Sequence, residues 1–378
     1  MERVLPLQIL ANVFWIIVGV VITRILDKPI ERYQKRFLFW LRRFIARFRI
    51  SDVMPIEQDI FRLGKWSARW IVVEGSSTDP YTPNNVICQL DPSPLTLSQD
   101  RLAKKQEIES TQTQLEISKG RRDYHNGPTV ALQGIGRGQI GTAEDPLLIL
   151  KLRPSDYYSF LATAISLDEV ITLSNGKKVS VREKYLQNLD FNTPLPEFAS
   201  ALSVNLSFIT SDGYVVVSKR AVEGIGGYQG HIAPAINECI NSVIDRSVSG
   251  TISLLATVQR GASSELNVEV EEDEVVFFTV GVDPRWYFWG VTGLIRSKKF
   301  SKADLLSRRS LGSKEHWEVN DLFFLPHNPF EIAKFMRNIS KTERWQPISI
   351  VCVVQTLISE FGIKAVEQAL RKYPPISQ

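Results

Sequence analysis

The chain has 378 residues, 44% hydrophobic and 23% charged, a composition that excludes a disordered or low-complexity polymer. Its three cysteines and four histidines are scattered, without CxxC or zinc-ligand spacing, so we expect a reducing compartment and neither a disulfide framework, a metal site nor a cofactor. The net charge of +4 is local, because the first 50 residues hold ten Lys or Arg against three acidic residues. This pattern favours a membrane surface near the N-terminus over DNA or RNA binding.

Residues 4–23 carry no charge and match the roughly 30 Å hydrocarbon core of a bilayer as one helix. Between the two terminal residues of this segment there are twelve Leu, Ile, Val or Phe, which favour insertion. A cleaved signal peptide is the alternative, but Trp15 stands mid-segment and Arg24 follows directly. The next thirteen residues contain five Lys or Arg, against Arg3 alone before the segment. The positive-inside rule therefore predicts a single-pass protein of the inner (cytoplasmic) membrane, with its C-terminal domain in the cytoplasm.

Four polar or small residues of this segment, Gln8, Asn12, Gly19 and Thr23, fall on one face of the expected helix. Lipid offers no hydrogen-bond partner, so such a face favours contact with another copy of the same helix. We therefore expect a homo-oligomer. The alternative is a passive anchor in which these residues are merely tolerated.

Residues 28–49 predict a basic helix with two unlike faces. Aromatic and aliphatic residues recur at helical spacing on one side, and Lys and Arg occupy the other. Such a helix either packs on the soluble domain or lies on the anionic inner leaflet, and its place directly after a spanning segment favours the leaflet. The apolar side comprises Tyr33, Phe37, Trp40, Leu41, Phe44, Ile45 and Phe48.

Residues 51–145 give weaker signals. Residues 70–73 predict a strand, and the Ser-, Thr- and Pro-rich stretch 76–94 predicts a loop. Residues 106–122 are polar and fit either an exposed helix or a disordered insertion. The glycine run at 134–138 looks like a phosphate-binding loop, but no Lys-Ser/Thr pair follows it, so we expect an ordinary flexible loop.

From residue 147 onward the sequence predicts individual helices and strands more clearly. Residues 204–210 alternate in polarity, Asp212-Gly213 supplies a turn, and residues 214–218 return as the second strand, which predicts a β-hairpin. The mixed order of elements predicts an α+β fold built as an α/β/α sandwich. The other expected elements are strands at 147–152, 274–282, 286–295 and 318–325, helices at 234–246 and 253–266, a helix capped by Ser155 through 160–165, a glycine-rich loop at 224–230, a short helix from Pro329 and a longer one from Pro347 that Gly362 ends.

Residues 203–268 resemble a Nudix domain. That fold opens with a hairpin ending in a basic residue, here at 203–220, followed by a glycine-containing loop and the signature helix G-x5-E-x7-R-E-U-x-E-E-x-G-U, in which U is a bulky aliphatic residue. Arg260, Glu265 and Val268 match signature positions. The departures are Gly261 and Ser264 in place of two glutamates, Asn267 in place of the glycine, and Arg246 and Ile252 in place of the upstream Gly and Glu.

The lost glutamates matter because Nudix hydrolases use them to hold divalent cations at a pyrophosphate, and hard cations need several carboxylate oxygens. Glu265 alone cannot build that cage, and the acidic run at 269–273 is expected to be a solvated loop. The resemblance therefore implies a Nudix-like domain at 146–378 that binds without hydrolysing. It follows the anchor (4–23), the basic helix (28–49) and the poorly interpreted region 51–145.

A spanning helix joined to a degenerate Nudix-like domain resembles the membrane effectors of bacterial cyclic-oligonucleotide anti-phage systems (CBASS). In that class a soluble sensor binds a cyclic nucleotide, and the membrane part assembles and compromises the inner membrane. The resemblance implies a membrane-anchored sensor–effector for a cyclic nucleotide or a related phosphate-bearing ligand. A membrane-tethered nucleoside-diphosphate hydrolase is one alternative, and a scaffold that holds a partner at the membrane is another.

The expected ligand-binding residues are Arg220, Tyr228, His231, Arg260 and Glu265. Arg220 ends the hairpin and can meet a phosphate, or it is a surface arginine. Tyr228 and His231 can stack on a base, or they pack in the fold. Arg260 either binds the ligand or pairs with Glu265 as a structural helix arginine. The aromatic residues of segment 285–289 fit a core strand as well as a nucleobase platform.

Overall fold

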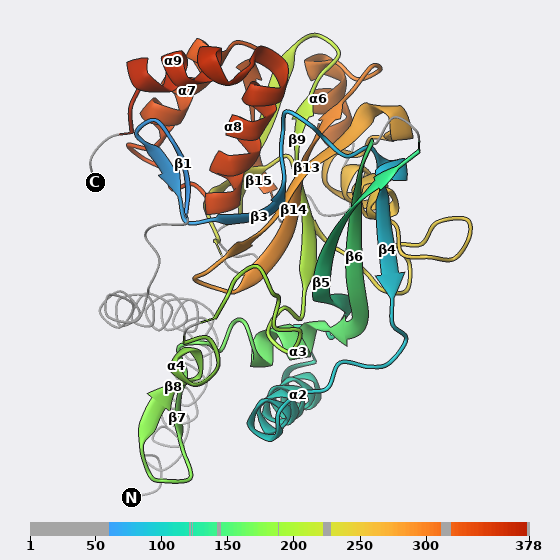
Figure 1. The fold of residues 1–378 in the computed structure, drawn as a ribbon, viewed down its shortest axis with the longest axis vertical. Coiled ribbons are helices and arrows are strands. Elements are labelled where there is room, and N and C mark those ends of the chain that lie inside the picture. Colours follow the sequence, from blue (N-terminus) through green and yellow to red (C-terminus); the bar gives the residue numbers. More distant parts are fainter. Residues whose placement is uncertain are drawn as a thin grey trace, which may run out of the picture. The chain divides into compact units, whose positions relative to one another are not determined.

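The computed structural model describes residues 60–120, 122, 124–141, 145–187, 189–221, 228–310 and 319–375, which belong to one compact unit (Figure 1). The expected membrane segment at 4–23, with Gln8, Asn12, Gly19 and Thr23, lies outside the described residues, and so does the basic helix at 28–49. Of the helices in the described ranges, none combines the length and apolarity needed to cross a bilayer.

The centre of the described part is a mixed sheet of eight strands. Its strands are β3 (Ile71–Gly75), β9 (Leu202–Ile209), β10 (Tyr214–Arg220), β11 (Ile232–Pro234), β12 (Ile236–Cys239), β13 (Val275–Asp283), β14 (Phe288–Arg296) and β15 (Val319–Pro326). The expected hairpin is confirmed as β9 and β10, which pair next to their turn at Ile209 and Val215. β14 lies parallel to β9, whereas β13 and β3 continue the sheet as antiparallel strands. The strands predicted at 70–73, 274–282, 286–295 and 318–325 are therefore confirmed.

Away from their turn, β9 and β10 pair with different neighbours. β11 pairs with β10, and β12 pairs with β9. These two strands replace the helix expected at 234–246, which was wrong. The physical reason is that the separated strands offer unpaired backbone groups, and residues 232–239 satisfy them. The helical spacing of the apolar residues in 234–246 gives no information about unpaired backbone groups on distant strands.

Three helices cover one face of the sheet. They are α7 (Pro329–Ile339), α8 (Pro347–Phe361) and α9 (Ile363–Lys372). α7 and α8 begin at prolines, as expected, because proline loses no hydrogen bond at a first helical position. Gly362 ends α8 with φ of 76°, and α9 starts at the next residue. α8 packs on β9, β11 and β14 with nine buried residues.

The other face carries α5 and a small sheet. α5 (Leu254–Gly261), capped by Ser253 and continued by a π-helix (Ala262–Leu266), lies against β12 and β9, and confirms the expected helix at 253–266. Leu132 and Leu150 of the small sheet share a core with Val204 and Phe277 of the large one. The small sheet contains β4 (Val86–Leu90), β5 (Pro128–Ile140) and β6 (Asp145–Asp156), in the order β4-β6-β5. The mixed architecture of helices and sheets confirms the coarse fold class.

The glycine run at 134–138, expected to be a flexible loop, lies inside β5 and pairs with β6. A Cβ atom at Gly136 or Gly138 would stand 3.4 or 3.3 Å from the side chains of Ile149 and Leu147. The glycines therefore admit bulky neighbours on the paired strand. The expected loop at 76–94 contains β4, and Asp156 rather than Ser155 caps the following helix, α3 (Tyr157–Ala162).

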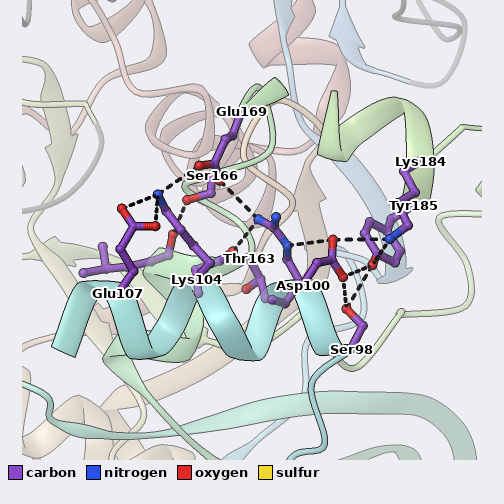
Figure 2. A network of polar contacts seen from close by, with 12 residues as sticks. Ser98, Asp100, Lys104, Glu107, Thr163, Ser166, Glu169, Lys184 and Tyr185 are labelled. Carbon is purple, nitrogen blue, oxygen red and sulfur yellow. Dashed lines mark hydrogen bonds and ion pairs between the residues drawn. The ribbon is translucent and has the colours of Figure 1, made fainter. Parts of the chain in front are cut away.

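A polar network lies around the long helix that connects β4 and β5 of the small sheet (Figure 2). The stretch expected at 106–122 is the C-terminal part of the long helix α2 (Gln99–Lys119), whose buried residues, Arg101 and Gln112, are polar. Arg101 donates to the carbonyl of Ala162 at 3.0 Å. Asp100 accepts from Tyr185 of α4 (Val181–Tyr185). The remaining elements are β1 (Phe61–Leu63), β2 (Trp66–Ala68), β7 (Val170–Thr172), β8 (Lys178–Ser180), α6 (Lys302–Ser310) and the 3-10 turns Pro83–Asn85 and Glu272–Glu274.

Candidate functional site

Several strand ends meet at one end of the large sheet. Because β14 is parallel to β9 and their other neighbours run antiparallel, the start of β14 lies beside the end of β13 and the start of β9. The end of β10 and the start of β11 complete this end, where the backbone N–H of Arg220 donates to the carbonyl of His231 at 3.0 Å. We call the residues that lie here the sheet-end site: Arg220, Tyr228, His231, Asp283, Arg285 and Trp286.

The turn between β13 and β14 forms the centre of this site. Asp283 is only 2% exposed and accepts hydrogen bonds from the backbone of Arg285 at 2.9 Å and from the hydroxyl of Tyr228. Tyr287 has a φ of 49°, in the left-handed region, and its hydroxyl accepts from the backbone of Leu195 at 2.9 Å. A left-handed non-glycine residue costs roughly 1–3 kcal/mol, so these contacts hold the turn in a form it would not adopt alone.

Aromatic rings surround the Tyr228–Asp283 hydrogen bond. The Tyr228 ring meets His231 edge-on, with centroids 5.3 Å apart, and meets Trp286 edge-on at 6.5 Å. Tyr228 also has a left-handed φ, of 60°. Two of the three left-handed non-glycine residues in the described ranges are thus in or beside one turn. Clustered backbone strain of this kind is typical of functional sites.

The buried pair is electrostatically unusual. Burial raises the pKa of the Tyr228 phenol well above its usual value, and the charge of Asp283 raises it further. The phenol therefore stays protonated and donates. Burial also raises the pKa of Asp283, although the hydrogen bonds from Tyr228 and Arg285 and the charges of Arg285 and Arg69 oppose this. The charges of both arginines act on the pair and favour the ionised form of the carboxyl.

Two N–H donors of the turn have no protein partner. The Nε of Arg285 and the indole Nε1 of Trp286 are buried without a hydrogen bond. The Arg285 guanidinium lies 5.1 Å from the centroid of the Trp286 ring. An unsatisfied buried donor costs roughly 1–3 kcal/mol. An oxygen atom of a phosphate group is the kind of acceptor that would satisfy either donor.

Arg260, expected either to bind the ligand or to pair with Glu265, pairs instead with Asp245 and Glu238. Its Nε lies 2.7 Å from Asp245, its Nη1 lies 2.8 Å from Glu238, and its Nη2 donates to the carbonyl of Cys239 at 2.7 Å. With every guanidinium nitrogen engaged, Arg260 acts as a structural residue that fastens α5 to β12 and to the turn at Asp245.

Glu265 lies on the π-helix and is 7% exposed. Its carboxylate accepts from the backbone of Asn237 at 3.0 Å. The nearby carboxylates of Glu238 and Asp245 are already paired with Arg260. Within the described ranges, no group of three or more His, Cys, Asp or Glu is arranged to hold a metal ion.

Two departures from the Nudix signature have structural explanations. A Cβ atom at Gly261 would lie 2.8 Å from Ile236 Cγ2 and 3.1 Å from Glu238 Cβ, so the helix approaches β12 too closely for a side chain. Asn267 has a φ of 57° and ends the π-helix in the left-handed conformation, which asparagine tolerates nearly as glycine does.

Of the expected ligand-binding residues, the structure brings Arg220, Tyr228 and His231 together at the sheet end and places Arg260 and Glu265 on α5 and its π-helical extension. Asp283 and Arg285 were not among them. The aromatic density of segment 285–289 was a partial signal for this turn, but nothing in the sequence indicates that Tyr228 reaches Asp283, 55 positions away.

Comparisons with known proteins add little. No protein-family model matches the chain, and neither does any curated protein. Among solved structures, the chain is similar to the protein DR0079 from Deinococcus radiodurans, at 13% identity, over 50% of this chain and 96% of that one. The TM-score of 0.26 is too low to carry an argument about fold or function.

Proposed function

We propose that the chain is a membrane-anchored sensor–effector that binds a cyclic nucleotide through the sheet-end site and does not hydrolyse it. In this proposal the soluble unit is a Nudix-like sandwich, and residues 4–23 anchor it in the inner membrane. Ligand binding promotes assembly of several copies, and the anchors then compromise the membrane in anti-phage defence, as the resemblance to CBASS effectors implies.

The observation that carries the proposal is the pair of unpartnered donors, Arg285 Nε and Trp286 Nε1, held in a strained turn. A phosphate oxygen is a natural acceptor for both, and a charge-assisted bond to arginine is roughly twice as strong as a neutral one. The half-buried ring of Trp286 supplies aromatic surface for a base, and the rings of Tyr228 and His231 pack behind it. Cation and aromatic surface together fit a nucleotide better than a peptide or a simple anion.

Binding without hydrolysis is supported by the surroundings of Glu265. A metal-dependent hydrolase needs several free carboxylate oxygens at one place. Here Glu238 and Asp245 neutralise Arg260, and Gly261 occupies a position where a glutamate side chain would clash with β12. The carboxylates near the signature helix therefore serve the fold.

The Nudix-like interpretation is supported by the order of elements. The β9–β10 hairpin comes before the signature helix α5, as the resemblance implies, although β11 and β12 lie between them in the chain. The assembly step is supported by the polar face of residues 8–23, which favours helix–helix contact at about 0.6–2 kcal/mol per hydrogen bond. Ligand-bound soluble units would raise the local concentration of anchors.

Calorimetric titration of the full-length protein in detergent with cyclic di- and trinucleotides tests the proposal. At least one ligand should bind, and Arg285→Ala should weaken its affinity about tenfold to a hundredfold, because a charge-assisted hydrogen bond contributes about 1.5–3 kcal/mol. Trp286→Phe keeps the ring and removes only the N–H, so it should weaken binding less.

Trp66→Phe is the matched control. Its indole N–H donates to the carbonyl of Tyr373 at 2.9 Å, between β2 and the end of α9, so losing it should leave affinity unchanged. The same ligands incubated with Mg²⁺ or Mn²⁺ should remain intact. Binding that survives Arg285→Ala and Trp286→Phe equally would place the ligand elsewhere, and metal-dependent turnover would favour the hydrolase.

A further inference from the structure

One buried arginine from outside the large sheet holds the turn of the sheet-end site. Arg182 of α4 is 8% exposed. Its Nη1 donates to the carbonyl of Pro284 at 3.0 Å, its Nη2 donates to the carbonyl of Arg285, and its Nε donates to Asp168 at 2.9 Å. Its guanidinium thus joins two successive peptide groups of the turn to a carboxylate on another segment.

Binding both carbonyls fixes the orientation of the peptide planes on either side of Arg285. These planes set the directions in which the side chains of Arg285 and Trp286 project from the backbone. The positions of their two unpartnered N–H donors therefore depend on the bonds to Arg182. The planar fork of arginine suits two neighbouring acceptors, whereas the point charge of lysine does not.

The anchor of Arg182 is itself held by the network around α2 (Figure 2). Asp168 precedes Glu169, whose carboxylate lies 2.9 Å from Lys104 and 3.4 Å from Arg101. The backbone N–H of Arg182 also donates to the carbonyl of Leu167 at 2.8 Å. Arg182 therefore connects the turn to a segment that α2 fixes in place.

We propose that Arg182 is the positioning residue of the sheet-end site. It holds the turn with Arg285 and Trp286 aimed for an oxygen-rich anion such as the phosphate of a nucleotide, without contacting that ligand itself. This inference rests on the proposed function for the identity of the ligand, but its structural part, control of the turn, is independent of it.

Hydrogen exchange at the amides of residues 285–288, measured in the ligand-free full-length protein in detergent, tests control of the turn. Arg182→Met should accelerate exchange there at least tenfold, because two hydrogen bonds that hold the turn are lost. Arg308→Met is the matched control. Arg308 donates to the carbonyl of Asn267 at 3.0 Å, so this variant also loses an arginine–carbonyl bond but leaves the turn untouched.

Calorimetry with the tightest-binding cyclic nucleotide supplies the second readout. Arg182→Met should lose about tenfold or more in affinity, Arg182→Lys should recover part of that loss, and Arg308→Met should bind like the parent. Unchanged exchange in Arg182→Met overturns the inference. If Arg182→Met exchanges rapidly throughout β9 as well, that variant has unfolded, and Arg182→Lys is then measured instead. Accelerated exchange of Arg182→Lys confined to residues 285–288 supports the inference. Exchange at the parental rate overturns it.

A parent that binds no cyclic nucleotide but shows accelerated exchange in Arg182→Met rejects the proposed function and keeps the positioning role. Binding that is equally weak in the Arg182 and Arg308 variants rejects the positioning role and leaves the proposed function standing. The two failures are therefore distinguishable.

Discussion

At the scale of single residues, Gly261 allows α5 to pack against β12. The helix lies so close to β12 that an added Cβ would stand 2.8 Å from Ile236 Cγ2. Neither atom can yield easily, because Ile236 is fully buried in the core. A larger side chain at this position, such as the glutamate of the Nudix signature, would not fit.

We therefore expect Gly261→Ala to lower the free energy of unfolding by about 1–2 kcal/mol. Overpacking costs about 1–3 kcal/mol, and the better helix propensity of alanine offsets up to about 1 kcal/mol of that cost. Urea unfolding followed by tryptophan fluorescence measures the change. Gly127→Ala is the control, because a Cβ there meets nothing within 4 Å. A Gly261→Ala protein as stable as the parent would show that α5 can move away from β12.

At the scale of elements, α2 is attached by charge more than by apolar contact. Its buried residues are Arg101 and Gln112, whereas Leu102 is 45% and Ile117 is 82% exposed. Burial alone would raise the pKa of the Asp100 carboxyl, but hydrogen bonds from Tyr185, Ser98 and Lys184 and the charge of Arg101 together lower it to about 2. Its ionised form thus stabilises the folded state.

The sign of the resulting pH dependence follows from this shift. The pKa of Asp100 is lower in the folded state than its ordinary 3.8, so its contribution is present above about pH 4 and is lost as the pH falls towards 2. Asp100→Asn should melt a few degrees below the parent at pH 6, and the difference should shrink to a small part of that as the pH falls to 2. Glu107→Gln, at a carboxylate that is 66% exposed, should change little at either pH. A difference in melting temperature between Asp100→Asn and the parent that stays constant from pH 6 to pH 2 would mean that the charge of Asp100 does not hold α2 in place.

At the scale of the whole molecule, the proposed function requires the N-terminal segment to insert in a membrane. Full-length protein should sediment with membranes and resist extraction by high salt and by alkali, because an inserted helix does not depend on charge. Deletion of residues 1–26 should leave at most a salt-sensitive attachment through the basic helix at 28–49. Sedimentation after each extraction measures both. Release of the full-length protein by salt alone would refute the anchor.

The sequence alone determined the elements that short-range rules specify. Alternation around Asp212-Gly213 predicted the β9–β10 hairpin, the prolines at 329 and 347 marked the starts of α7 and α8, and Gly362 marked the end of α8. The capping serine at 253 likewise predicted α5. Each of these signals depends on residues only a few positions apart, so no knowledge of distant neighbours was needed.

Only the tertiary structure decided the rest. Residues 234–246 follow unpaired strands rather than their own helical spacing, and the glycine run at 134–138 is a strand because β6 lies beside it. The candidate site shows the same limit, since Tyr228 meets Asp283 and Arg182 meets Pro284 across 55 and 102 positions. Local sequence sets the conformational preferences of a short segment. Which buried donor meets which acceptor depends on how the whole chain packs. The charged groups of the sheet-end site are therefore brought together only by the tertiary structure.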